Sequence, residues 1–124
     1  MKMREQEQEG MQELNKLKAH RVACLEVAQA AEVLAKAERA LARQLLALIK
    51  LSERLNTMQP ERARRLLAAG WGETELDKVN RAGARVNEAI TALMEAAERW
   101  GETMQELAEM HLGAEGDSEV KDER

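Results

Sequence analysis

Two histidines and a single cysteine are the side chains of this chain best suited to hold a metal ion. His20 and Cys24 are four residues apart, so a helix places them on one face. If two long helices pair in an antiparallel manner, in the register given below, His111 lies opposite His20. Zinc needs a fourth ligand, and no carboxylate or second thiol lies close enough to these residues on that seam to complete the set. We therefore expect polar filling near a helix end, with no metal and no other cofactor.

No other group of residues predicts catalysis. Glu38 falls on the expected seam opposite Leu93, where a buried carboxylate costs several kcal/mol unless it is paired or protonated. The alanines around it supply no second polar group. The sequence contains no convincing nucleophile–base pair, no phosphate-cradling glycine loop and no carboxylate dyad. We predict that the protein is not an enzyme.

A basic group follows the first long helical pattern and could bind phosphates or an acidic partner; it comprises Arg54, Arg62, Arg64 and Arg65. Residues 62–79 also have the spacing of a helix-turn-helix. Its second helix, however, would open with Glu73, Glu75 and Asp77, which repel a nucleic-acid backbone. A solvated tip, with arginine stems that cover apolar surface, is the preferred interpretation.

Helix-period spacing must position all of these residues. Apolar positions alternate in steps of three and four along two arms separated by Pro60. The first stripe is His20, Cys24, Val27, Ala31, Leu34, Glu38, Leu41, Leu45, Leu48, Ser52 and Leu55. The second is Leu76, Val79, Gly83, Val86, Ile90, Leu93, Ala97, Trp100, Met104, Leu107 and His111. This spacing predicts one packed stripe on each of two long helices.

Glycine and proline set the expected boundaries. Neither residue occurs between Met11 and Gln59, Pro60 suits the first turn of a new helix, and Gly70 suits a helix end. Thr74 is the expected N-cap of the last helix. We predict one helical domain over 1–112, with helices at about 5–58, 60–69 and 73–112. The charged remainder, 113–124, is expected to be a flexible acidic tail.

An antiparallel hairpin with a short tip helix is the expected all-α fold. Pairing Leu55 with Leu76 places Leu48 beside Gly83, so that a large side chain faces a small one. The alternative topology folds the short helix back as a full arm and leaves the two long helices parallel. The last helix is expected to run through Gly101, although the capping pattern that follows marks a weak point there.

Positions beside the expected seam are mostly alanine, whereas a self-sufficient coiled coil carries charges there. The apolar face is therefore too wide for one partner helix, and we expect a homodimer that forms a four-helix bundle or a coiled-coil-like assembly. Whether the two copies run parallel or antiparallel stays open. The expected partner-binding residues are Ala35, Ala42, Ile49, Ala82, Ala89, Met94, Met104 and Met110.

Composition and charge leave function broad. The chain has 124 residues, no Phe or Tyr and a net charge of −4. Residues 1–58 carry 10 basic and 8 acidic side chains, whereas 73–112 carry 4 and 9. The absence of a signal peptide or a long apolar run predicts a cytoplasmic protein without a membrane partner. We expect a non-catalytic protein–protein interaction module, such as an adaptor, an assembly or secretion chaperone, or a small regulator or inhibitor. The alternative is a nucleic-acid-linked role, either through the basic tip or as an acidic mimic that inhibits a nucleic-acid-binding partner.

Overall fold

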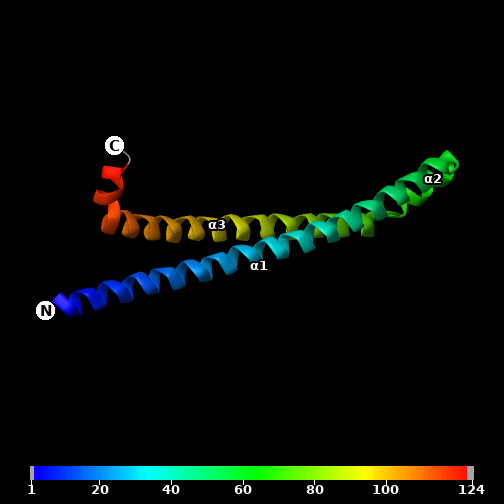
Figure 1. Ribbon diagram of the computed structural model, residues 1–124. Coiled ribbons are helices and arrows are strands. Elements are labelled where there is room, and N and C mark those ends of the chain that lie inside the picture. Colours follow the sequence, from blue (N-terminus) through cyan, green and yellow to red (C-terminus); the bar gives the residue numbers. More distant parts are fainter. Residues whose placement is uncertain (1, 123–124) are drawn as a thin grey trace. The chain divides into compact units, whose positions relative to one another are not determined.

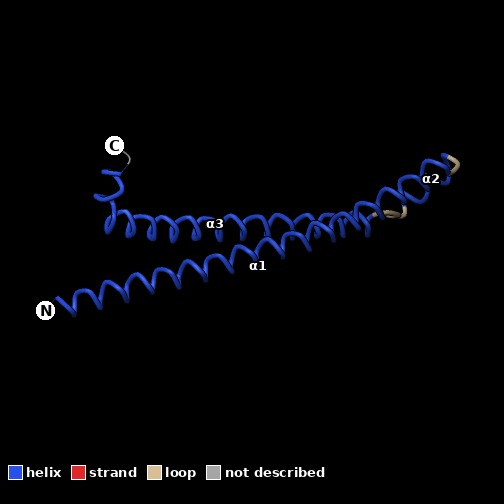
Figure 2. Tube along the Cα trace, viewed as in Figure 1, coloured by secondary structure: helices blue, strands red, loops and turns tan. Residues whose placement is uncertain are grey.

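A computed structural model describes the backbone of residues 2–122 and the side chains of residues 4–110. Three helices make up most of residues 2–122: α1 (Lys2–Thr57), α2 (Pro60–Ala68) and α3 (Glu73–Asp122). Short connections join them (Figures 1 and 2). Residues 2–122 contain no strand. The all-α prediction and its three helices are confirmed.

The corner between α1 and α2 is built on proline. Met58 is the only residue between Thr57 and Gln59, and Pro60 begins the next helix, where its missing N–H needs no acceptor. Gln59 makes no side-chain cap; its carbonyl instead accepts a hydrogen bond from the Ala63 N–H at 3.0 Å. The predicted break at Pro60 is therefore confirmed.

The corner between α2 and α3 is built on two glycines in the left-handed region, Gly70 with φ of 88° and Gly72 with φ of 96°. At the end of α2 the Trp71 N–H donates to the Leu66 carbonyl at 2.9 Å, and the Gly70 N–H donates to Leu67 at 3.1 Å. These bonds close the helix around a left-handed glycine. Gly70 thus ends α2 as predicted.

The start of α3 differs from the expectation. The Leu76 N–H donates to the Gly72 carbonyl at 3.0 Å, so the first turn is anchored at Gly72 and Thr74 lies inside the helix. The Thr74 N-cap prediction is wrong. The helix then runs through Gly101 without interruption, as expected.

Helix α3 ends at Asp122, beyond the expected end near residue 112. That expectation relied on glycines as breakers, yet an isolated glycine costs a helix only about 1 kcal/mol relative to alanine. The side chains of 111–124 lie outside the described residues. The flexible acidic tail therefore stays a prediction.

The chain divides into two compact units, and each contains part of α1 and part of α3. Unit 1 comprises residues 1–30 and 93–124, and unit 2 comprises residues 31–92, which include α2. Each unit is a packed helical pair in its own right.

In unit 1 the two helices run antiparallel. His20 Nδ1 lies 2.9 Å from Thr103 Oγ1, and the Arg99 Nε donates to Glu26 Oε2 at 2.9 Å. As α1 advances, its partners on α3 therefore recede in sequence. Extending the His20–Thr103 register pairs Ala23 with Trp100, Val27 with Ala96 and Ala30 with Leu93. Each of these three layers sets a large side chain against an alanine.

In unit 2 the corner supplies the register. A Cβ placed on Gly72 would lie 3.2 Å from the Leu51 Cδ2, so these two residues are directly apposed. Extending this register matches larger residues with alanine in three layers: Leu41 with Ala82, Ala37 with Val86, and Leu34 with Ala89. A fourth layer pairs Gln44 with Val79.

The expected register is wrong, and only half of each expected stripe faces inward. In unit 2 Leu51, rather than Leu55, lies beside the start of α3, because α2 lies alongside the last turns of α1 and occupies that length of it. In addition, each helix is rotated slightly, so that one of the two columns in its stripe moves back by one residue and the other column stays inward. The inward residues of α1 follow the spacing 20, 23, 27, 30 rather than 20, 24, 27, 31, and those of α3 follow 79, 82, 86, 89.

The rotation has a clear physical advantage. Glu38 and Ser52, which the expected seam would have buried, are exposed. No carboxylate is therefore desolvated. The alanine column of α3 takes the vacated inner positions, and small side chains allow the two backbones to approach closely.

The result is a core made of alanine. The buried residues among those described are Ala23, Ala82, Ala89 and Ala96, at 2–5% exposure. No larger side chain among residues 4–110 is fully buried. Larger apolar side chains are only partly buried on the inward positions, as for Leu34 and Leu41, or lie outside the helical pair.

Candidate functional site

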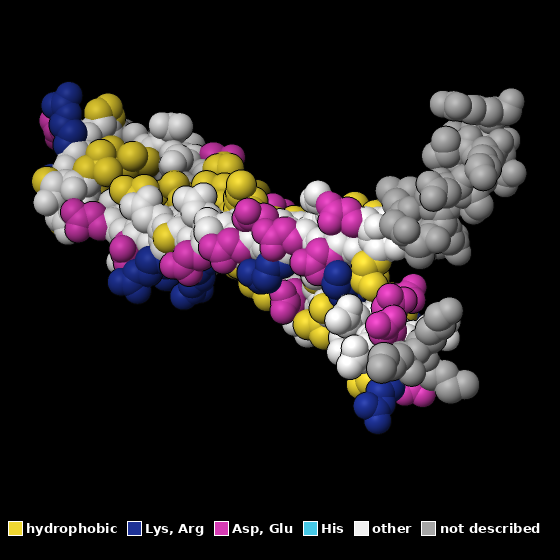
Figure 3. Space-filling view, turned by 90° about the vertical axis from the view of Figure 1, so that its left-hand side faces the viewer, with side chains coloured by type: hydrophobic (Ala, Val, Ile, Leu, Met, Phe, Trp, Pro, Cys, Tyr) yellow, Lys and Arg dark blue, Asp and Glu magenta, His cyan; other side chains and the backbone are white. Residues whose placement is uncertain are grey.

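Large apolar side chains cover one side of unit 2. Leu45, Ile49, Leu76 and Ile90 are 39–52% exposed, and the neighbouring Ala35 and Ala42 are exposed as well. We call these six residues the apolar face of unit 2. On the side of the molecule drawn in Figure 3, exposed hydrophobic side chains (yellow) gather in groups beside charged side chains. A contiguous apolar surface of this kind usually marks an interaction site.

Helix geometry places these residues on the same side. Leu45 follows the inward Gln44 by one position, and Ile90 follows the inward Ala89 in the same way. In an antiparallel pair, the residues that directly follow the alanine column of one helix lie beside the residues that directly follow the alanine column of the other helix. Each helix also has a second inward column, which contains Val27 on α1 and Trp100 on α3. The residues that directly precede this column lie together on the opposite flank of the pair, as the Glu26–Arg99 ion pair of unit 1 shows.

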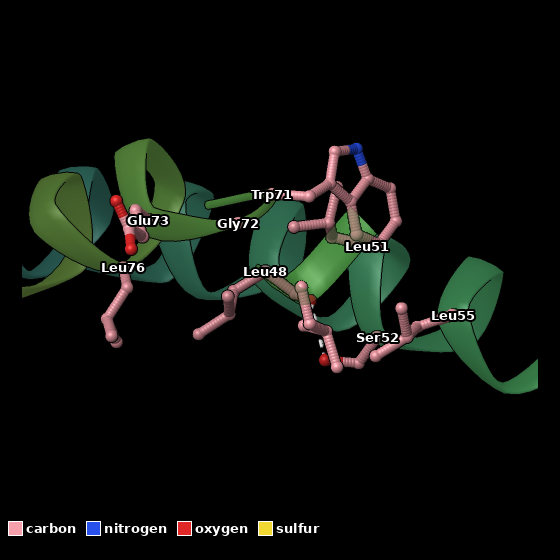
Figure 4. A pocket seen from close by; sticks show the side chains of 9 residues that line it. Leu48, Leu51, Ser52, Leu55, Trp71, Gly72, Glu73 and Leu76 are labelled. Atoms are coloured by element: carbon pink, nitrogen blue, oxygen red, sulfur yellow. Dashed lines mark hydrogen bonds between the residues drawn. The ribbon is translucent and has the colours of Figure 1, made fainter. Parts of the chain in front are cut away.

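An apolar hollow of about 290 Å³ continues this face at the corner of unit 2. Its lining residues are Leu48, Leu51, Ser52, Leu55, Leu67, Trp71, Gly72, Glu73 and Leu76. All three helices contribute to it. The close-up in Figure 4 shows Leu48 and Leu76 pointing to the same side. The Ser52 hydroxyl donates to the Leu48 carbonyl at 3.0 Å, which satisfies it within α1. The hollow is thus suited to an apolar side chain.

Unit 1 carries its own exposed apolar residues. Met94 and Met104 are 67% and 45% exposed, and Met110 is partly exposed. Flexible thioether side chains adapt to irregular partners, so these positions suit a binding surface. Their partner-binding role stays a prediction.

Two of the expected partner-binding residues lie elsewhere. Ala82 and Ala89 are buried within unit 2, where the register sets them against Leu41 and Leu34. Their side chains are not presented to a partner in this structure. The sequence could not distinguish them from their neighbours, because both candidate stripes of α3 consist of apolar residues at helical spacing.

A polar chain in unit 1 links α1 and α3. The Thr103 hydroxyl donates to the Trp100 carbonyl at 3.0 Å, so it accepts a hydrogen bond from His20 Nδ1. Nδ1 therefore carries the proton in this network, and Nε2 is free to accept from the Cys24 thiol, whose Sγ lies 3.6 Å away. The His20 ring also lies against Trp100, with ring centroids 5.8 Å apart. This network orients the imidazole and fixes the register of unit 1.

The sequence predicted part of this cluster. It placed His20 and Cys24 on one face, but it missed Thr103 because the expected register set His111 opposite His20. The side chain of His111 lies outside the described residues. Within the described part of the chain, no three His, Cys, Asp or Glu side chains come together as a metal site.

The basic tip residues are all exposed: Arg54 at the end of α1, and Arg62, Arg64 and Arg65 on α2. In residues 4–110 none of the four forms an ion pair within 4.0 Å. Their side chains are therefore available to solvent or to an acidic ligand.

No family model matches the chain, and neither the curated proteins nor the solved structures include one that is significantly similar to it. No helix in the described residues is both long enough and apolar enough to cross a membrane.

Proposed function

We propose that the protein is a non-catalytic helical interaction module that associates with a second copy of itself through the apolar face of unit 2. Two such faces stacked together form a four-helix bundle, with the hollow at the corner receiving an apolar side chain of the partner. The assembled module then offers its remaining surfaces to another protein.

The observation that carries this proposal is that small side chains are buried whereas large apolar side chains are exposed, which reverses the usual arrangement. The described core contains only alanines, and Leu45, Ile49, Leu76 and Ile90 lie outside it. An alanine buries little apolar area, whereas full burial of a Leu or Ile side chain contributes about 1.5–3 kcal/mol. A single helical pair therefore leaves most of its hydrophobic stabilisation unused.

Long helices that lack a core of their own usually gain stability from packing against further helices. Covering the four half-exposed side chains contributes about 1 kcal/mol each on each copy. A second copy supplies an identical apolar face, so a two-fold arrangement covers both faces at once. Because one contact covers both apolar faces, self-association is favoured over binding of an unrelated partner.

Adjacent leucines allow a matched test. Leu45 belongs to the apolar face, whereas Leu46 lies on the next helical position outward and is 57% exposed. We expect Leu45→Glu to raise the dimer dissociation constant at least tenfold, because association would bury its carboxylate. Leu46→Glu should change it by less than threefold. Sedimentation velocity over a concentration series measures both values.

Circular dichroism confirms that each variant remains helical at the concentrations used. Equal effects of the two substitutions, or no effect of Leu45→Glu on a dimer that does form, would show that association uses another face.

A further inference from the structure

The flank of unit 2 opposite its apolar face is strongly basic. Seven cationic side chains lie there, all exposed, whereas only two acidic residues, Glu88 and Asp77, lie among or beside them. They are Lys36, Arg43, Lys50 and Arg54 on α1, and Lys78, Arg81 and Arg85 on α3. We call this set the basic face of unit 2.

Nearly all of these charges lack an acidic partner. Among the described side chains, only Arg81 forms an ion pair, with Asp77 of its own helix at 3.0 Å, and that pair is largely exposed. The register explains why: Lys78 and Arg85 stand across from Ala47 and Ala40. The nearest charged residues of α1 on that flank have the same sign.

The corresponding flank of unit 1 shows what a neutralised arrangement looks like. There Arg99 occupies the position equivalent to Arg85 and Lys78, and it donates to Glu26 of α1 at 2.9 Å. Unit 2 keeps the cations at this position but replaces the glutamate by alanine. Cations gathered without counter-charges repel one another, and an external polyanion relieves that repulsion.

We propose that the basic face of unit 2 binds the phosphate backbone of double-stranded nucleic acid without reading its sequence. From Lys36 to Arg54 the α1 row spans about 27 Å at 1.5 Å per residue. That length matches about eight base pairs. The α3 row from Lys78 to Arg85 runs beside part of it for about 10 Å, so the face presents cations to phosphates of both strands where they pass it.

The side chains of the basic face favour double-stranded nucleic acid over single strands, membranes and a second copy of the chain. Single-strand binding relies on aromatic stacking. Both tryptophans are engaged elsewhere: Trp71 lines the hollow, and Trp100 lies against His20. A membrane surface requires large apolar side chains among the cations, whereas the face offers chiefly alanines such as Ala40 and Ala47. A second copy offers one row of glutamates, on α3, whereas the basic face has two rows of cations; that row is Glu88, Glu95, Glu102 and Glu109.

Binding of a fluorescein-labelled 20-base-pair duplex of arbitrary sequence to the full-length chain, followed by anisotropy, tests the proposal. Six phosphate contacts predict a slope of about −5 in log affinity against log salt, which is a loss of about 10³-fold between 50 and 200 mM salt. The triple variant Arg43→Gln, Lys50→Gln, Arg85→Gln should lose at least tenfold in affinity and reduce the slope by about 3.

The matched control removes three cations from the tip of the same unit: Arg62→Gln, Arg64→Gln, Arg65→Gln. It should bind the duplex within threefold of the unaltered chain. Circular dichroism establishes that both triple variants are folded.

Four outcomes would overturn the proposal. The first two are no duplex binding by the unaltered chain at 50 mM salt, and a loss of duplex affinity in the tip control that equals or exceeds the loss in the face variant. The third is binding to anionic vesicles but not to the duplex, and the fourth is a fall in solution mass as the main effect of the face variant. The last result would assign the basic face to contact between copies.

Discussion

Units 1 and 2 use the same packing scheme but hold it in place by different means. In unit 1, His20 contacts Thr103 and Glu26 contacts Arg99, so polar contacts connect the two helices directly. In unit 2 the described side-chain hydrogen bonds and ion pairs stay within one helix. Its register comes instead from the glycine corner, where Leu51 packs against Gly72.

The difference teaches how an alanine core can specify one register. Layers of Leu or Val against Ala repeat along the helices, so apolar packing alone would tolerate a slip of one heptad. Polar contacts in unit 1 and the covalent corner in unit 2 remove that ambiguity.

The largest expected effect comes from overfilling the alanine layers of unit 2. Ala82→Leu with Ala89→Leu places two leucines against Leu41 and Leu34. At about 1–3 kcal/mol for each overpacked site, the pair should lower the free energy of unfolding by about 2–6 kcal/mol. Guanidinium unfolding followed by circular dichroism measures the change.

A control adds the same volume outside the core. Ala84 and Ala92 are exposed on the same helix, and Ala84→Leu with Ala92→Leu should change stability by less than about 1 kcal/mol. If the two pairs of substitutions had equal effects, alanine would not be the core of unit 2.

The glycine corner predicts a smaller effect. Gly72→Ala introduces a side chain at φ of 96° and 3.2 Å from Leu51, and should cost about 1–3 kcal/mol in unfolding free energy. Gly101, in the α3 segment of unit 1, has open space around its Cβ position. Gly101→Ala should therefore raise stability by up to about 1 kcal/mol. Thermal and guanidinium unfolding of both variants measures the two changes in stability. A Gly72→Ala variant more stable than the unaltered chain would contradict the role of Gly72 in the corner.

The histidine network of unit 1 should contribute about 1 kcal/mol. Thr103→Val keeps the shape of the side chain but removes the hydroxyl that accepts from His20, so we expect a loss of that size in unfolding free energy. Thr91→Val is the control, because the Thr91 hydroxyl bonds only to the Asn87 carbonyl of its own helix, at 3.1 Å, and is exposed. Urea unfolding of both variants measures the difference, and equal losses would mean that the cross-helix bond adds nothing.

The smallest effect belongs to the Glu26–Arg99 ion pair. Both side chains are well exposed, at 39% and 53%, so solvent and salt screen their attraction. A double-mutant cycle of Glu26→Gln and Arg99→Gln should give a coupling energy below about 1 kcal/mol that declines as salt rises. A coupling that is large and insensitive to salt would show that the pair is buried in the assembled protein.

Much of the fold could be predicted from the sequence, because backbone chemistry is local. Pro60 and Gly70 marked the two corners, and the glycine-free run before Gln59 predicted one long helix. The packed faces could not be predicted as easily. On α1 the stripes through Ala31 and Ala30 are both largely apolar at helical spacing. What distinguishes them is the cost of burying Glu38 and Ser52 in the first stripe, together with the match of large to small residues across the pair.

The same limit applies to the candidate site. Ile49 was expected on the interaction surface and is exposed, whereas Ala89 was expected beside it and is buried. A stripe of alanine at helical spacing is equally typical of an exposed binding surface and of the closest contact between two helices. The hollow around Trp71 depends on how α2 lies along α1, which no local pattern reveals.

The solution mass of the unaltered chain tests the central claim most directly, namely that an alanine core leaves each chain incomplete without a second copy. Sedimentation equilibrium between about 1 and 100 μM should give twice the chain mass of 13.9 kDa at the upper concentrations, with reversible dissociation on dilution. A stable, fully helical species at 13.9 kDa across the whole range would contradict the claim.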